Sequence, residues 1–586
     1  MRKKSFERGW STYPAGHEGV QVNTCKSVGC QNFGVSPYID NSEIVEVTNR
    51  HHPFYTTSGK GKNEAAIICK ACKENKAYFP RTQVSWVMKS NEAIVQESER
   101  FWRYLDKSVK CPNKECFQDQ EGRAIKKRGF TKKGTQRYFC NCCKTSFTIE
   151  HTKPHKRSEI NRRVFDLIVC KTPLRKIARH LNISPRTIYL KIDFIHKQCL
   201  KYAAYHEAKI LEHQISLPEK IHLSTDRQVL VSNWNKQEDK RNVEVYGIGT
   251  ACQKTGYVFG YHFNFDGSIT QSEIELLAAE NKDEDKPKHH RKSARAWLIN
   301  DFEESIRNSA SSKKKTVQLT ESESEVIEDA TSEQLDKYKQ LPPHGVLIHN
   351  EYTMMGHFLF LKRLLKHIPE KCFHVDDDSG MKTALLSIFA NEIKQEKCHG
   401  TVISSSKGFT VNQRRSEVSK TSKLIKNYCG RSRQGMSGLD FYQITLEILK
   451  DTLRGVGDND WFEHPIATMS EPKKKVLAIS KLSELTEEVR ADTYWRASLH
   501  PIDRFFMQIR RSINLFERPF TSASNESTWY GYAPYNPEMF QKLGDIYRVY
   551  YNFCEKNGKK GTPAMKLGLT KSVIDLEKII YFSKYQ

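Results

Sequence analysis

The chain has 586 residues, and its 94 Lys and Arg outnumber its 69 Asp and Glu to give a formal net charge of +25 at pH 7. This length exceeds what one hydrophobic core supports and indicates about three to five domains. No apolar run reaches about 18 residues, which excludes a membrane-spanning helix, and the basic residues 1–16 lack the apolar segment of a secretory signal. We therefore expect a cytoplasmic protein with no membrane partner, and its charge favours nucleic acid as the partner.

Eight of the 16 cysteines form two copies of one spacing pattern, each with one pair separated by four residues and one pair separated by two. The first copy is Cys25, Cys30, Cys69 and Cys72, and the second is Cys111, Cys116, Cys140 and Cys143. Cytoplasmic cysteines are thiols or metal ligands rather than disulfides, and two such pairs close a tetrahedral zinc site with four thiolate ligands. Buried free cysteines do not explain the same spacing twice. We predict two structural Zn²⁺ ions, one in a module over residues 1–100 and one in a zinc ribbon over residues 101–150.

The second copy has the layout of a zinc ribbon, because a hairpin with a glycine turn separates its two cysteine pairs. Cys142 lies inside the last pair and could replace a neighbour as ligand. The hairpin is basic and is predicted to contact phosphates. Its basic residues are Lys126, Lys127, Arg128, Lys132, Lys133 and Arg137. In the first copy, 38 residues separate the two pairs.

Residues 151–215 are predicted to form a helix-turn-helix domain. Thr172 is a suitable N-cap with Pro173 at the first helical position, and Ser184 is a suitable N-cap for a second helix that begins at Pro185. In such a domain the second helix enters the major groove of DNA. The predicted DNA contacts are Arg186, Thr187, Tyr189 and Lys191. A helical hairpin that does not bind DNA is the alternative.

Residues 216–410 contain three strand-like runs, at 221–234, 242–252 and 257–266, and two more near 372–376 and 399–409. This order is that of the ribonuclease-H-like fold. Asp226 interrupts the first run, and a buried carboxylate needs a metal or another partner unless it faces solvent. The fourth run ends on Asp376, Asp377 and Asp378, followed by a helix. Ligands bind at the carboxyl ends of strands in open α/β folds, and adjacent carboxylates favour a bound cation. These three aspartates are therefore a candidate metal site. The alternative is that they only cap the following helix.

Two segments are interpreted as insertions. Residues 280–342 carry blocks of charge and few apolar residues, so we expect a mobile charged insertion with one helical piece near residues 296–306. Residues 411–497 are basic, and their apolar spacing predicts a helical insertion.

The last segment, residues 498–586, begins with an amphipathic helix that carries Asp503 in its first turn. Asp503 is either a third catalytic acid or a helix cap. Glu517, about four turns further on the same predicted helix, is the competing carboxylate. Arg510 and Arg511 are suited to a phosphate backbone. The expected fold class is a multidomain α+β protein with two four-cysteine zinc modules, a helix-turn-helix, and a ribonuclease-H-like α/β core with a helical insertion.

From residue 111 onward the chain resembles DDE transposases of bacterial insertion sequences. The resemblance rests on the ribbon motifs CPNKEC and RYFCNCCKTSFT, the helix-turn-helix, FHVDDDSG before a helix, and the tail YYNFCEKNGKKGTPAMKLGLTK. It implies a triad of Asp226, Asp376 and Asp503, with Asp378 and Glu517 as rivals. The third acid of the family is Glu, so Asp503 is a departure from its pattern.

The resemblance also implies two catalytic Mg²⁺ ions, for which Mn²⁺ can substitute, and cleavage at an element end followed by strand transfer. The implied partners are double-stranded DNA, as terminal repeats and as target, and at least one further copy of the chain. The implied location is the nucleoid of a bacterial cytoplasm. A catalytically inactive DNA-binding regulator and a metal-dependent nuclease without strand transfer are the alternatives.

Overall fold

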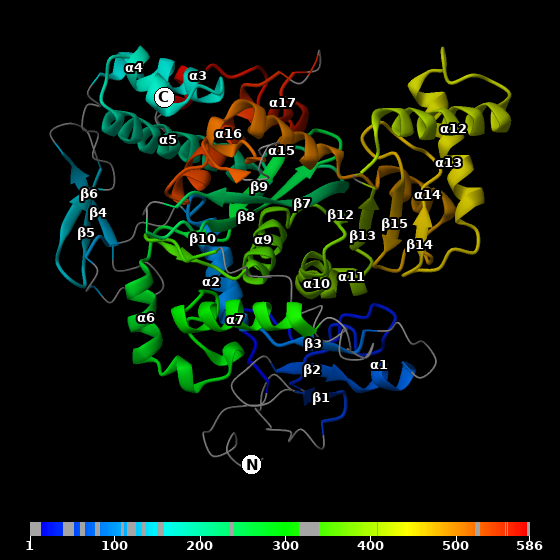
Figure 1. Cartoon of the computed structure of the whole chain (residues 1–586), viewed down its shortest axis with the longest axis horizontal. Coiled ribbons are helices and arrows are strands. Elements are labelled where there is room, and N and C mark those ends of the chain that lie inside the picture. The colour runs from blue at the N-terminus through cyan, green and yellow to red at the C-terminus, as the bar shows by residue number, and fades with distance from the viewer. Residues whose placement is uncertain are drawn as a thin grey trace.

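The computed structural model describes residues 13–38, 52–58, 65–76, 83–106, 111–113, 116, 125–131, 136–148, 157–234, 238–315, 339–406, 408–521, 528–556, 558 and 561–582. Helices and strands are mixed along the chain (Figure 1). The main hydrophobic core extends from residue 22 to residue 580, and a second, smaller core lies in the N-terminal module.

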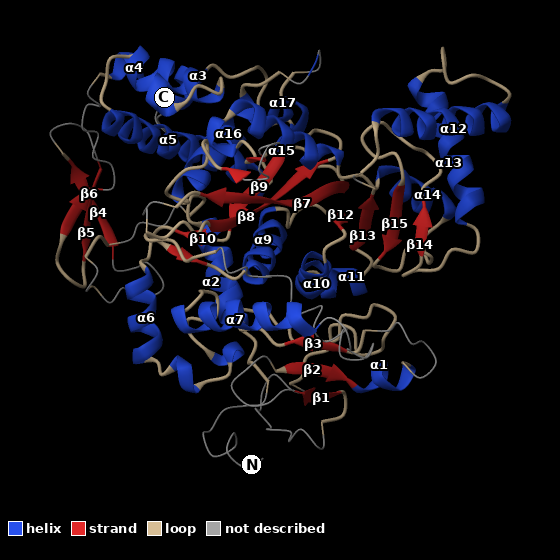
Figure 2. Cartoon of the chain, viewed as in Figure 1, coloured by secondary structure: helices blue, strands red, loops and turns tan. Residues whose placement is uncertain are grey.

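A seven-stranded sheet is the centre of the molecule (Figure 2). Its strands, in spatial order, are β14 (Trp461–Glu463), β15 (Lys474–Ala478), β13 (Cys398–Ser405), β12 (Glu370–Asp376), β7 (Lys220–Ser232), β8 (Val243–Cys252) and β9 (Val258–Phe263). Strands β7, β8 and β9 are antiparallel neighbours, and β12 is parallel to both β7 and β13. Gly256, with φ +74°, makes the tight turn between β8 and β9. The five strand-like runs of residues 216–410 therefore form adjacent strands.

Helices cover both faces of this sheet (Figure 1). One face packs against α9 (Asn350–Leu364), which in turn contacts α10 (Ser379–Ile388), with α11 (Ala390–Lys394) following. The other face packs against α15 (His500–Ser512) and α16 (Glu538–Phe553), and α17 (Pro563–Leu567) contacts α16. Every residue of β9 is buried, because a strand between two helical layers has no solvent-facing side. Helix α2 (Asn91–Trp102), at the end of the segment assigned to the first zinc module, packs along α9.

Two small antiparallel sheets carry the cysteine pairs. The first consists of β1 (Tyr55–Ser58), β2 (Ala66–Cys69) and β3 (Ser85–Val87), with α1 (Lys70–Asn75) after β2. The second consists of β4 (Ile125–Phe130), β5 (Gln136–Cys140) and β6 (Ser146–Thr148).

The region predicted as a helix-turn-helix contains a 3-10 turn (Ser158–Ile160), α3 (Asn161–Val169), α4 (Leu174–His180) and α5 (Pro185–Leu211). The Oγ of Ser184 accepts the Thr187 N–H, so the predicted N-cap of α5 is confirmed. The prediction for α4 is wrong by one position: Pro173 is the N-cap, not the first helical residue, and Thr172 does not cap. Helix α5 has 27 residues and packs against α16 and α18 (Leu576–Ile580), so it joins the helical domain to the core.

The interpretation of residues 280–342 as mobile is wrong for its first part. After α6 (Gln271–Glu280) come two 3-10 turns, Asp283–Asp285 and Lys288–His290, and then α7 (Ile299–Lys315). Asp283 is fully buried and accepts hydrogen bonds from the backbone of Lys292 and from the backbone and hydroxyl of Ser293. Satisfied polar contacts of this kind allow a charged segment to pack. Strands β10 (Phe265–Asp266) and β11 (Val346–Leu347) pair across the segment, and residues 316–338 lie outside the described chain.

The segment 411–497 is helical as expected in α12 (Val411–Cys429), α13 (Gly438–Leu453) and α14 (Glu487–Arg496). The prediction missed β14 and β15, which extend the central sheet at the edge of β13. These strands form because β13 offers unpaired backbone groups at its edge. The predicted helix from residue 498 is α15, but it ends at Ser512 and is followed by a 3-10 turn (Asn514–Phe516), so Glu517 is not on the same helix as Asp503. A short hairpin, β16 (Phe520–Thr521) and β17 (Thr528–Trp529), follows.

Candidate functional site

Asp226 and Asp376 occupy matching positions on two adjacent parallel strands. In the register of β7 and β12, Thr225 is opposite Val375, so the next pair along is Asp226 and Asp376. Neighbouring strands are about 4.8 Å apart, and opposite residues point to the same face. Both side chains are half-buried, and Asp226 Oδ1 accepts the Arg227 N–H at 2.7 Å. The sheet therefore places two carboxylates side by side where β12 ends.

Helix α15 covers the face to which Asp226 points. Asp226 is directly opposite Gly249 of β8, and a Cβ atom on Gly249 would lie 2.8 Å from Ile502 Cδ1 and 3.2 Å from Phe506 Cε1. The helix thus rests directly on the glycine beside Asp226. Asp503 follows Ile502 in the first turn of α15 and is exposed.

Arg510 connects α15 to the strand that carries Asp226. Its Nη1 donates to Gln228 Oε1 at 3.1 Å, and Gln228 is on the same face of β7 as Asp226. Burial, and then the charge of Arg518, lower the pKa of Arg510, while the charges of Asp503 and Asp226 oppose this shift. The charges of Asp226 and Asp503 therefore both favour the protonated form of the Arg510 guanidinium group.

The described residues contain three clusters of potential metal ligands whose donor atoms lie within 4.8 Å of one another, and none of them is the set Asp226, Asp376 and Asp503. The structure thus places Asp226 and Asp376 side by side and Asp503 on the helix that covers them. The three carboxylates are not all within 4.8 Å of one another.

The two rival acids have contacts of a different kind. Asp378 Oδ1 accepts the Met381 N–H at 3.0 Å and so caps α10, and its Oδ2 pairs with Arg227 at 2.6 Å. Glu517 pairs with Lys171 at 2.7 Å, and so binds the core to the turn before α4. These contacts assign Asp378 to a helix cap and Glu517 to a domain contact.

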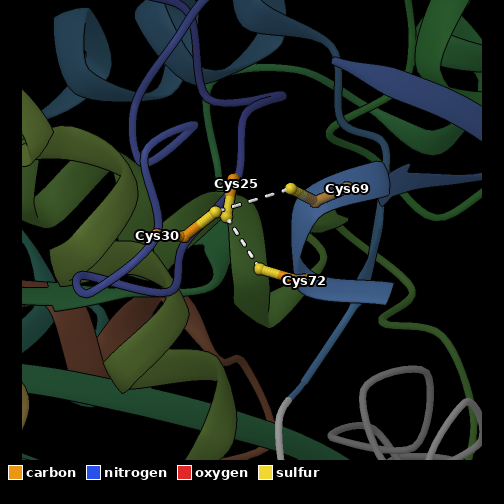
Figure 3. A group of neighbouring side chains, drawn as sticks. All are labelled: Cys25, Cys30, Cys69 and Cys72. Atoms are coloured by element: carbon orange, nitrogen blue, oxygen red, sulfur yellow. Dashed lines mark hydrogen bonds between the residues drawn. The ribbon is translucent and has the colours of Figure 1, made fainter. Parts of the chain in front are cut away.

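The four cysteines of the first module converge in one cluster (Figure 3). Cys25 Sγ lies 3.5 Å from Cys72 Sγ, and Cys30 Sγ lies 3.7 Å from Cys69 Sγ. In a tetrahedral zinc site with Zn–S bonds of about 2.3 Å, sulfur atoms are about 3.8 Å apart. Cys25 and Cys30 come from a loop, whereas Cys69 ends β2 and Cys72 lies in α1 (Figure 3). This cluster has the donor set and the spacing to hold a zinc ion.

The second tetrad has the same geometry. Cys111 Sγ lies 3.4 Å from Cys143 Sγ, and Cys116 Sγ lies 3.5 Å from Cys140 Sγ. Cys142 is exposed and does not belong to the tetrad. Both cysteine tetrads can therefore hold zinc. The basic residues Lys126, Lys127 and Arg128 of the hairpin are exposed on β4, Arg137 is exposed on β5, and Lys132 and Lys133 lie outside the described residues.

The predicted DNA contacts of α5 differ in exposure. Arg186 is exposed and Tyr189 is 48% exposed, whereas Thr187 is half-buried, with its hydroxyl 2.9 Å from Ser184 Oγ. Lys191 is buried, and its Nζ donates to Arg157 O at 2.8 Å and to Asn161 Oδ1 at 2.6 Å. Its prediction as a DNA contact is wrong, because these partners on a neighbouring segment draw the ammonium group inward.

Of the two arginines predicted to contact phosphates on α15, Arg511 is exposed and Arg510 is half-buried against Gln228. A buried cluster of His222, Cys372 and His374 was not predicted from the sequence. In the sequence, His222 lies four residues before Asp226, and Cys372 and His374 lie four and two residues before Asp376. Even spacing places these side chains on the same face of each strand as the aspartates, and this is the sequence pattern that indicates the cluster.

No protein-family model matches the chain, and none of the curated proteins matches it. Among the described residues, no helix is both long and apolar enough to cross a membrane.

Proposed function

We propose that the chain is a DDE-type DNA transposase with a ribonuclease-H-like core, and that Asp226, Asp376 and Asp503 are its catalytic acids. The observation that supports this most is the pairing of Asp226 with Asp376 on adjacent parallel strands. The sheet order β9-β8-β7-β12-β13 supports it too, since this is the order that the resemblance implies. Helix α15, which carries Asp503, covers the same face.

The donor set fits the proposed metal. Carboxylate oxygens at the end of a sheet are the ligands that Mg²⁺ takes, together with substrate phosphates. Bound there, two Mg²⁺ ions, or Mn²⁺ in their place, would activate water for DNA cleavage and a 3′-hydroxyl for strand transfer. The three acids act in their ionised form. Arg510 holds α15 against β7 through Gln228 and so sets the position of Asp503.

The remaining modules supply the DNA contacts in this proposal. The two zinc modules and the helical domain recognise the terminal repeats, with Arg186, Thr187 and Tyr189 on α5 at the groove and Arg511 at the backbone. Phosphate contacts set orientation, while base contacts give specificity. Two ends are joined by at least two copies of the chain, in the nucleoid of a bacterial cytoplasm.

The experiment combines the full chain, Mg²⁺ and duplex DNA from the two borders of the genomic segment that encodes it. We expect cleaved and then joined strands, and we expect Asp226→Asn, Asp376→Asn and Asp503→Asn each to abolish both while DNA binding persists. Asp377→Asn is the matched control, because Asp377 is an exposed residue of the turn after β12. Its activity should equal that of the wild type.

Two further variants test the rivals. Asp378→Asn keeps the helix cap, because Asn caps as well as Asp, and Glu517→Gln removes only the pair with Lys171. Loss of cleavage in either variant, with activity retained in Asp376→Asn or Asp503→Asn, would contradict the corresponding assignment.

A catalytically inactive DNA-binding regulator is the second candidate. The absence of a tight cluster of all three acids among the described residues favours it. Binding of border DNA without cleavage would identify this function, and cleavage without joining would identify a nuclease.

A further inference from the structure

A second set of polar side chains lies on the same face of the sheet as the two aspartates, further back along the strands. His222 and Asp226 are four residues apart on β7, and Cys372, His374 and Asp376 alternate on β12. His222 is directly opposite Cys372 in the parallel register, so the two side chains share a face. His374 is two residues further along and shares it as well. The three residues are nevertheless fully or almost fully buried.

The donor atoms of these three residues converge. Each residue has one donor atom within 4.8 Å of the others, and His222 Nδ1 lies 3.1 Å from His374 Nε2. In a tetrahedral zinc site, two nitrogen ligands are about 3.3 Å apart and a nitrogen and a sulfur about 3.6 Å. Small side-chain rotations would bring all three donors to such distances.

The outer nitrogen of His374 has a hydrogen-bond partner of the kind that orients metal ligands, and the outer nitrogen of His222 faces a carboxylate beyond hydrogen-bond distance. His374 Nδ1 lies 2.8 Å from Thr401 Oγ1, and His222 Nε2 lies 3.9 Å from Asp492 Oδ2. Asp492 is itself held by Arg496 at 2.8 Å. A histidine whose second nitrogen faces a carboxylate or another fixed oxygen is typical of metal sites.

A second histidine pair, between β9 and α9, provides a comparison. His262 Nδ1 lies 2.9 Å from His357 Nδ1, and both residues are buried. His262 stacks on Phe101 with ring centroids 3.9 Å apart, and this pair belongs to none of the three metal-ligand clusters found among the described residues. A buried histidine pair alone is therefore a packing feature here, and Cys372 is what distinguishes the pair on β7 and β12.

We propose that His222, Cys372 and His374 bind a third zinc ion inside the core. Two imidazoles and one thiolate suit Zn²⁺, and three protein ligands leave one tetrahedral position for a further ligand. The ion bridges β7 and β12 beneath Asp226 and Asp376, and so holds the two strands in the register that pairs these acids. Its role is structural and independent of whether the chain transposes DNA.

The test is the zinc content of the purified full chain, measured by mass spectrometry after dialysis. It is performed on the double variant Asp226→Asn/Asp376→Asn, so that zinc on these carboxylates is not counted. With both cysteine tetrads filled, we expect three ions per chain, and two after the further change Cys372→Ser or His374→Gln. Cys398→Ser is the matched control: Cys398 is equally buried on β13 but is opposite Lys371, on the other face. It should retain all three.

Two ions per chain after titration with excess zinc would overturn the proposal, as would three ions in the Cys372→Ser protein. A second measurement needs no variant and covers the case in which a substitution prevents folding. Crystals of the full chain, with diffraction recorded at the zinc absorption edge, should show an anomalous peak between His222 and His374. Peaks at the two cysteine tetrads without one at this position would equally refute the third site.

Discussion

Replacing Gly249 with alanine should displace α15 from the strand beside Asp226. The new Cβ would lie 2.8 Å from Ile502 Cδ1 and 3.2 Å from Phe506 Cε1, whereas carbon atoms in ordinary contact are about 3.5–4.0 Å apart. The Ile502 and Phe506 side chains, or α15 with them, must therefore shift by roughly 1 Å. Overpacking of this kind costs about 1–3 kcal/mol of stability, and a misplacement of about 1 Å at a catalytic group can lower the rate about 100-fold.

The matched control is Gly400→Ala. Gly400 is on β13, opposite Phe373 and so on the face away from Asp376, and its Cβ would lie 2.9 Å from Ile479 Cγ1 and 3.1 Å from Leu385 Cδ2, neither of which belongs to α15. Thermal unfolding should show a similar loss of stability in both variants, about 2–4 °C per kcal/mol for a domain of this size. Only Gly249→Ala should reduce Mg²⁺-dependent cleavage of border DNA.

The substitution Ile502→Val removes the Cδ1 atom that the new methyl group would meet. Combined with Gly249→Ala, it should restore both stability and cleavage in part. Equal cleavage by the Gly249→Ala and Gly400→Ala proteins, or the absence of any rescue by Ile502→Val, would show that α15 does not position the third acid.

Three further predictions concern the rest of the molecule. Cys116→Ser should remove one zinc ion per chain, whereas Cys142→Ser, outside the tetrad, should remove none, as measured by metal analysis. Burial lowers the pKa of His206 to about 4, whereas a histidine of the unfolded chain has a pKa of about 6.5. As the pH falls from 6.5 to 4, the unfolded chain therefore binds a proton that the folded chain does not, and the free energy of unfolding should fall by about 3 kcal/mol. His206→Gln should make the free energy of unfolding less dependent on pH over this range. Arg548 Nη1 and Glu207 Oε1 form a buried ion pair at 2.6 Å between α16 and α5. Arg548→Met should lower the free energy of unfolding, measured with denaturant, by about 3–5 kcal/mol. An Arg548→Met protein as stable as the wild type would show that this pair does not join the helical domain to the core.

Local patterns in the sequence predicted the elements that depend on neighbouring residues. The spacing of the cysteine pairs predicted both tetrads, because two thiols of one turn approach one ion together. Strand-like runs predicted the five adjacent strands of residues 216–410, and the cap of α5 followed from Ser184.

Features that depend on distant partners were missed. Strands β14 and β15 form because β13 has a free edge, and nothing local marks them as strands within a helical segment. The sequence predicted Lys191 as a DNA contact because its position on α5 resembles an exposed one. Its ammonium group instead donates to the Arg157 carbonyl and to Asn161 in the interior of the helical domain. The cluster of His222, Cys372 and His374 joins residues about 150 positions apart, and only the register of β7 and β12 brings them together.

The most direct test of the proposed function is strand joining by the full chain with DNA from both borders of its genomic segment. The proposed function predicts joined products in Mg²⁺ or Mn²⁺, none in EDTA, and none with Asp226→Asn, although this variant still binds the DNA. Joining by the Asp226→Asn protein, or binding without any cleavage by the wild-type protein in either metal, would contradict it.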